Sequence, residues 1–178
     1  MRAARVLAAL VTAVAAPLAP GAQPVTSANW SRHPAVAEVR AIYREIAAAE
    51  AAGRLRKQQR KFEFCQPYED TGRTLYLDAR GAVRSYRFAG GSEDSTAERA
   101  LYYDRGGHLR FVLIRAGAVN GTSLELRIYL SKTGERLWEK RDLLKGPGYT
   151  FPNPWPQSDL VGHPRQAFDA ASPCPELK

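Results

Sequence analysis

The fold of this chain is set by a stretch that reads Leu101-Tyr102-Tyr103-Asp104-Arg105-Gly106-Gly107-His108-Leu109. Two related stretches flank it: Leu75-Tyr76-Leu77-Asp78-Ala79-Arg80-Gly81-Ala82-Val83 and Arg127-Ile128-Tyr129-Leu130-Ser131-Lys132-Thr133-Gly134. The turn glycines Gly81, Gly107 and Gly134 recur every 26 or 27 residues, each between two apolar, β-prone runs. This repeat predicts three successive β-hairpins.

The turn residues also predict how the strands pair. An Asp at the turn entry, followed three residues later by Gly, favours a type I turn with a G1 bulge. In the third stretch Leu137 comes one residue later after the glycine than Val83 and Leu109 do, so we expect a longer loop. The expected pairs are Leu77 with Val83, Tyr76 with Arg84, Tyr103 with Leu109, Tyr102 with Arg110, Leu130 with Leu137, and Tyr129 with Trp138.

This pairing divides the predicted sheet into two faces. One is mainly aliphatic and is the expected seat of a helix; it holds Leu75, Leu77, Val83, Leu101, Leu109, Phe111, Leu113, Leu126, Ile128, Leu130 and Leu137. The other is aromatic and cationic, and it holds Tyr76, Arg84, Tyr86, Phe88, Tyr102, Arg110, Val112, Ile114, Arg127, Tyr129 and Trp138. Because so apolar a face is rarely left bare in a soluble monomer, we expect the segment 146–155 to cover part of it.

The flanking segments complete an α+β fold. Apolar residues from Val36 to Ile46 recur at helical spacing, which predicts an amphipathic N-terminal helix over about 34–52. The alternation Phe62-Glu63-Phe64 predicts a first strand, in a sheet that covers about 60–142. The sequence therefore predicts this helix packed on a six- or seven-stranded antiparallel β-meander, followed by a proline-rich C-terminal tail, 146–178, with a last helical turn near 165–171.

The first 22 residues have the parts of a secretory signal peptide: basic Arg2 and Arg5, an apolar run, and a small-residue exit. The apolar run is too short to span a bilayer, so no transmembrane segment is predicted. We expect residues 23–178 to form a single exported domain, periplasmic or extracellular, and to be a monomer. In an oxidising compartment Cys65 and Cys174 are expected to pair as a disulfide.

The charge of the chain is basic, with 26 Lys and Arg against 18 Asp and Glu. Such a balance favours anionic partners. An arginine-rich coding habit is the better explanation of this balance. The charges are also scattered, apart from the run 54–61, rather than gathered into one basic patch. We therefore expect no nucleic-acid partner.

Candidate catalytic chemistry is sparse. His33, His108 and His163 share no metal-ligand spacing, so no metal site and no cofactor is predicted. His163 lies near Asp159, and a His–carboxylate pair can serve as a general base. An envelope hydrolase centred on His163 and Asp159 is therefore one alternative, and a purely structural envelope protein is another.

The constellation with the most specific geometry is the set of tyrosines and arginines on the aromatic face. Tyrosine opposite arginine permits cation–π contact and is a combination enriched at binding sites. It can equally serve to stabilise a sheet. The candidate binding residues are Tyr76, Arg84, Tyr102, Arg110, Arg127, Tyr129 and Trp138.

The stretch Tyr103-Asp104-Arg105-Gly106-Gly107-His108-Leu109 resembles the YD-type hairpin repeats of bacterial secreted proteins. The order of a helix and then a long meander is similar to that of small exported bacterial proteins of cystatin-like and lactamase-inhibitor-like form. Together with the aromatic face, these features lead us to expect an exported, non-catalytic binding or interaction module of the bacterial envelope, with an unknown protein or an anionic ligand as partner.

Overall fold

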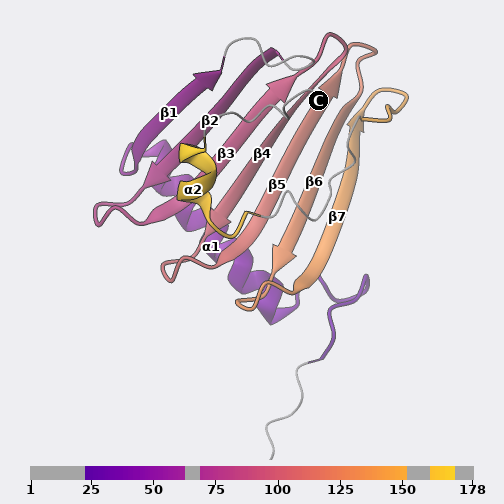
Figure 1. The fold of residues 1–178 in the computed structure, drawn as a ribbon. Coiled ribbons are helices and arrows are strands. Elements are labelled where there is room, and N and C mark those ends of the chain that lie inside the picture. The colour runs from indigo at the N-terminus through magenta and orange to yellow at the C-terminus, as the bar shows by residue number, and fades with distance from the viewer. Residues whose placement is uncertain (1–22, 63–68, 152–160, 171–178) are drawn as a thin grey trace, which may run out of the picture.

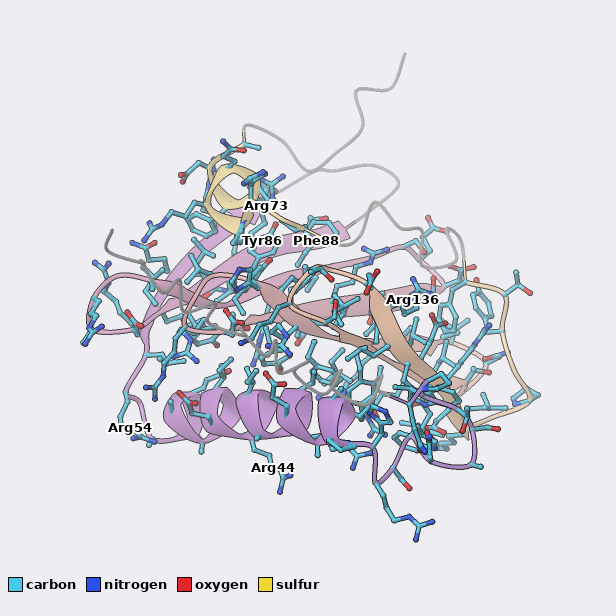
Figure 2. All side chains as sticks on the ribbon, turned by 90° about the horizontal axis from the view of Figure 1, so that it is seen from below. Arg44, Arg54, Arg73, Tyr86, Phe88 and Arg136 are labelled. Atoms are coloured by element: carbon cyan, nitrogen blue, oxygen red, sulfur yellow. The ribbon has the colours of Figure 1, made fainter. Side chains whose placement is uncertain are left out.

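The computed structural model describes residues 23–62, 69–151 and 161–170. Seven antiparallel strands form one sheet in chain order (Figure 1). They are β1 Arg56–Phe62, β2 Glu69–Leu77, β3 Val83–Gly91, β4 Ser95–Tyr103, β5 Leu109–Ala118, β6 Ser123–Leu130 and β7 Arg136–Lys145. Helix α1, Pro34–Ala51, lies across one face, and the short helix α2, Pro164–Asp169, lies on the other (Figure 2). The predicted antiparallel meander is confirmed.

Some predictions concern residues outside the described ranges. They are the signal peptide at 1–22, the Cys65–Cys174 disulfide, and the prolines of the tail between 152 and 160. These stay predictions. No helix in the described part of the chain has the length and apolarity needed to cross a membrane.

Helix α1 begins and ends where its sequence indicates. Pro34 occupies the first turn, and the ring of His33 accepts a hydrogen bond from the backbone N–H of Ala35 at 3.2 Å. The chain leaves the helix through Gly53, whose φ of 65° lies in the left-handed region. Val36, Val39 and Ile46 are buried against the sheet, so the apolar spacing marks the packed side of the helix.

Strand β1 begins earlier than predicted. The basic run that was expected to precede the first strand forms that strand itself, Arg56–Phe62, at the edge of the sheet. Its side chains alternate between exposed and half-buried. Charged side chains on an edge strand discourage pairing with other chains, which gives the run a physical role in the fold.

The three hairpin turns have one geometry. In the first, Asp78 N–H donates to Ala82 O and Gly81 N–H donates to Asp78 O; the same two bonds recur at Asp104 and at Ser131. Asp78 Oδ1, Asp104 Oδ1 and Ser131 Oγ each accept two backbone N–H groups of their own turn. The longer third loop predicted from the sequence is therefore wrong, because a Ser hydroxyl replaces the Asp carboxylate without changing the turn.

Each hairpin also contains a second bulge, directly after the turn. The pairs Leu77–Val83, Tyr103–Leu109 and Tyr129–Trp138 are confirmed. The other three predicted pairs are wrong: Tyr76 pairs with Ser85, Tyr102 with Phe111, and Leu130 with Arg136. The extra residues of these bulges are Arg84, Arg110 and Leu137.

One extra residue moves every later side chain of a strand to the opposite face. Phe111 and Leu113 therefore lie on the face that α1 covers, and Val112 and Ile114 lie on the other. Tyr86 and Phe88, predicted on the aromatic face, lie on the side of α2 (Figure 2). We call the two sides of the sheet the α1 face and the α2 face.

The two covers are exchanged relative to the prediction. Helix α1 was expected on the leucine-rich face, but it packs on the side that holds Tyr102 and Tyr129. The described parts of the C-terminal segment pack on the other side, where Phe168 of α2 joins the leucine-rich cluster and Phe151 packs with Ala116 and Leu124. The exchange is not complete: Phe111 and Leu113 were expected under the helix and lie there, and Tyr86 and Phe88 were expected on the opposite face and lie there.

Arginines hold α2 in place on its face. Arg60 Nη1 donates to Phe168 O at 2.7 Å, and Arg73 Nη1 donates to Ala170 O at 2.8 Å. Cations at the C-terminal end of a helix satisfy its last carbonyls and oppose its dipole. Tyr103 adds a hydrogen bond to Val161 O at 2.7 Å, so strands β1, β2 and β4 all anchor the segment.

Candidate functional site

All seven predicted binding residues lie on the α1 face. The face that sequence reasoning marked for ligands is therefore largely the seat of a helix. The residues divide into three groups, according to whether they bond α1, form its aromatic core, or line a remaining groove.

Arg84 and Arg110 belong to the first group. The Nε of Arg84 donates to Tyr103 O at 3.3 Å, and the Nε of Arg110 donates to Leu130 O at 3.2 Å, so each bulge arginine bonds the next hairpin. Their outer nitrogens pair with Glu45 at 3.4 Å and Glu38 at 3.1 Å. Seven residues of helix rise about 10.5 Å, close to the roughly 9.6 Å that separates alternate strands. The spacing of Arg84 and Arg110 in the sheet therefore matches the spacing of Glu45 and Glu38 in the helix. The two ion pairs set the position of α1 on the sheet.

Tyr102 and Tyr76 belong to the second group. The Tyr102 ring meets Tyr43 edge-on at 5.0 Å, and burial raises the pKa of Tyr102 to about 12. Tyr76 lies under the guanidinium of Arg87 at 5.0 Å, and Arg87 holds both carboxylate oxygens of Glu50 at 2.6 Å. These contacts tie the C-terminal half of α1 to the sheet; Tyr102 is buried by them, whereas Tyr76 is half-buried and also lines a cavity over β1 to β4.

Trp138 is stacked on Trp30, with ring centroids 5.8 Å apart and planes 9° from parallel. Trp30 also contacts Tyr129, and the guanidinium of Arg40 lies over both rings, 5.0 Å from Trp30 and 6.0 Å from Tyr129. Sequence reasoning missed Trp30 and Arg40. The available signal was a tryptophan shortly before a helix whose first turns carry an arginine.

A groove remains between α1 and strands β5 and β6. Its volume is about 240 Å³. It is lined by Arg40, Tyr43, Arg44, Phe111, Leu113, Arg115, Glu125, Arg127 and Tyr129. The predicted residues Arg127 and Tyr129 thus meet at one site, together with seven residues that the prediction did not include.

The electrostatics of this groove centre on Glu125, of which 4% is exposed. Its Oε2 accepts from Arg115 Nε at 3.0 Å, and its Oε1 pairs with Arg127. Arg127 also lies 3.5 Å from Asp142. Four arginines and one carboxylate are therefore among the described residues that line the groove, and two of the arginines contact that carboxylate. Arg115 and Glu125 are direct cross-strand partners, a pairing that a correct register would have revealed.

A second cavity, of about 570 Å³, lies over strands β1 to β4. Its lining includes Lys57, Gln59, Lys61, Arg87 and Glu98. These long polar side chains stand beside the rings of Phe62 and Tyr76 and beside small residues such as Gly72 and Ala89. Ligand sites usually combine a buried apolar floor with a few polar groups. Phe111, Leu113 and Tyr129 give the smaller groove such a floor, so it is the stronger candidate.

Side-chain contacts within their own segments are made by two of the three histidines, His33 and His108. His33 caps α1 and bonds Gln23 O at 2.8 Å, and the His108 ring lies 3.1 Å from the Asp104 carboxylate within its own turn. His163 precedes α2 and makes no side-chain cap bond. Its predicted partner Asp159 lies outside the described residues, so the hydrolase alternative stays a prediction. Within the described ranges, no cluster of His, Cys, Asp and Glu suits a metal ion.

Comparison of the chain with known protein families, with curated proteins and with solved structures finds no match.

Proposed function

We propose that this protein is an exported, non-catalytic binding module of the bacterial envelope, and that the groove between α1 and strands β5 and β6 is its binding site. The observation that carries the proposal is the composition of the groove, an aromatic and aliphatic floor beside four arginines. Export rests on the signal-like sequence of residues 1–22.

The floor and the arginines supply complementary kinds of recognition. Tyr43, Phe111 and Tyr129 offer ring surface that favours an apolar group, and the guanidinium group has several fixed donors for a polar one. The rings are held by one another, since Phe111 lies 5.0 Å from both Tyr43 and Tyr129. A preorganised floor loses little side-chain entropy on binding, which favours affinity in a small site.

A fragment screen by NMR tests the site. Isotope-labelled protein starting at residue 23 is mixed with fragments of varied charge and polarity, and the backbone amide shifts are followed. We expect the binding fragments to shift amides of residues 40–44, 111–115 and 125–129. Shifts confined to other parts of the sheet, such as residues 57–61 beside the second cavity, would contradict the proposal.

Two matched variants sharpen this test. Tyr43 and Tyr149 are both half-buried tyrosines, but only Tyr43 lines the groove. We expect Tyr43→Leu to weaken fragment binding and Tyr149→Leu to leave it unchanged, with thermal unfolding used to verify that both variants fold. If both changes weaken fragment binding equally, the cause is a general loss of structure, and the variants no longer support the groove as the binding site.

A further inference from the structure

The groove has an apolar inner part and a cationic outer part. Phe111, Leu113 and Tyr129 form the inner part and are buried. At the outer part, the side chain of Arg115 is 62% exposed and that of Arg127 is 36% exposed. One end of a ligand in this groove contacts the rings and the leucine, and the other end contacts the guanidinium groups.

The charge at the outer part is only partly balanced by the described residues, because four lining arginines face few carboxylates. Glu125 is shared by Arg115 and Arg127 and is the only carboxylate among the described residues that line the groove; Asp142, outside the lining, pairs with Arg127. Arg40 has no carboxylate within ion-pair distance among the described residues; its Nη1 donates to Ser31 O at 2.6 Å, and its plane lies over rings. Arg44 points away from the sheet and adds positive charge at the outside (Figure 2). The groove therefore favours an anion.

The volume limits the apolar part of a ligand. Drug-sized ligands occupy cavities of roughly 300–1,000 Å³, whereas a dry cavity of about 150 Å³ is enough for benzene. A groove of about 240 Å³ thus has room for one ring or a short acyl chain and a small head group.

From this division we infer that the groove binds a small amphiphilic anion, in which a carboxylate or phosphate head is attached to an apolar body of about one ring. The inference rests on the proposed function, because it names the ligand class of the same site. The head lies against the arginines and the body lies on Phe111, Leu113 and Tyr129. Guanidinium groups donate well to both carboxylate and phosphate oxygens, so the shared chemistry is an oxyanion.

A set of ligands that share one ring tests the head group. Phenylpropionate, phenethyl phosphate, phenylpropanol and phenethylammonium are titrated by NMR, with acetate as the head group alone. We expect the two oxyanions to bind at least about tenfold more tightly than the alcohol. Their affinity should fall as salt is added, because exposed charges are screened. Acetate should bind more weakly than phenylpropionate.

Two double variants test the arginines. Arg40→Gln/Arg115→Gln removes two groove cations, and Arg54→Gln/Arg80→Gln removes two exposed arginines elsewhere (Arg54 is labelled in Figure 2). We expect the first to weaken oxyanion binding about tenfold or more while the alcohol changes less than about twofold. The second leaves both affinities unchanged although it alters the net charge equally.

The outcomes separate the ligand class from the site. If the alcohol binds the groove as tightly as the oxyanions, or acetate as tightly as phenylpropionate, the inferred class is wrong while the proposed site stands. If both double variants weaken the oxyanions equally, general charge rather than the groove is responsible, and the inference fails. If the fragment screen shifts no groove amides, the site itself fails.

Discussion

The bulge residues Arg84 and Arg110 show how one side chain can serve both local and long-range structure. Each is buried, each bonds a backbone carbonyl of the next hairpin, and each pairs with a glutamate of α1. The bulge turns each arginine toward the helix. From the sequence, a binding role and a packing role for such an arginine are hard to tell apart. The contacts favour packing for both residues.

Replacing Arg110 by Ala should lower the free energy of unfolding by about 2–4 kcal/mol, since a buried charged donor to Leu130 O, Glu38 and Asp104 is lost. Arg105→Ala is the matched control. The Arg105 side chain is 79% exposed, and its pair with Glu45 should contribute less than about 1 kcal/mol. Urea unfolding measures both variants, and equal losses would contradict the structural role of Arg110.

Asp104 is a second residue whose contacts predict a measurable effect. Burial raises the pKa of its carboxyl, but hydrogen bonds from the His108 N–H and ring, from Arg110 and from the Gly106 N–H outweigh burial and hold the pKa below its ordinary value. A lowered pKa in the folded state means that ionised Asp104 adds stability above the unfolded pKa, about 3.9, and that this stability is lost as the pH falls through the folded pKa.

Asp104→Asn keeps the turn acceptor but removes the charge. We expect the variant to be about 1 kcal/mol less stable than the wild type at pH 7, and the difference to shrink as the pH falls below about 4. Urea unfolding of both proteins between pH 3 and pH 7 measures this difference. A difference that is the same at pH 7 and at pH 3 would mean that the charge does not contribute.

At the scale of elements, the three hairpins are one structural unit repeated. Gly107 and Gly134 both have positive φ, 82° and 86°, and a Cβ added at either would meet nothing within 4 Å. Any cost of substitution at these positions therefore comes from the backbone rather than from a clash.

We predict that Gly107→Ala and Gly134→Ala each destabilise the protein by about 1–2 kcal/mol, and that the corresponding Asn variants cost less, because Asn tolerates the left-handed region. Thermal unfolding of the four variants measures this. A much smaller effect at Gly134 than at Gly107 would contradict the shared geometry of the turns that Ser131 and Asp104 begin.

For the whole molecule, the sheet is a layer between two different covers. Helix α1 covers one face by ring packing and ion pairs, and the described C-terminal segment covers part of the other through Phe168, Tyr103 and the two arginines that bond its carbonyls. Burial raises the pKa of Tyr103 above its ordinary value, which agrees with a hydroxyl that is enclosed under this segment.

Phe168→Ala should remove this anchor and loosen the segment. We expect a loss of about 2–4 kcal/mol, together with faster hydrogen exchange at Ala167 and Ala170, whose N–H groups bond His163 O and Gln166 O. Val119→Ala, at a residue that is 77% exposed, is the control and should change neither. Unchanged exchange at Ala167 in the Phe168 variant would show that Phe168 is not what holds α2.

The candidate site could be predicted only in part. Arg127 and Tyr129 were predicted because the expected pairing placed them on the aromatic face. Arg40, Tyr43 and Arg115 come from a helix and a strand whose juxtaposition depends on packing. Tyr102 and Arg110 looked equally suitable as binding residues. Whether such a residue ends under a helix or beside one depends on where the helix crosses the sheet, and nothing local encodes that crossing.

What the sequence alone determined is the set of local structures: three turns ending at Gly81, Gly107 and Gly134, strands of alternating apolar residues, and a helix that begins at Pro34. These depend on contacts between neighbours in the chain, and their residue types specify them. The tertiary structure decided which face each cover takes. Each bulge adds one residue, Arg84 in β3 and Arg110 in β5, and so moves the later side chains of that strand to the opposite face. This arrangement is stable because each arginine bonds a carbonyl and a glutamate that are distant in sequence.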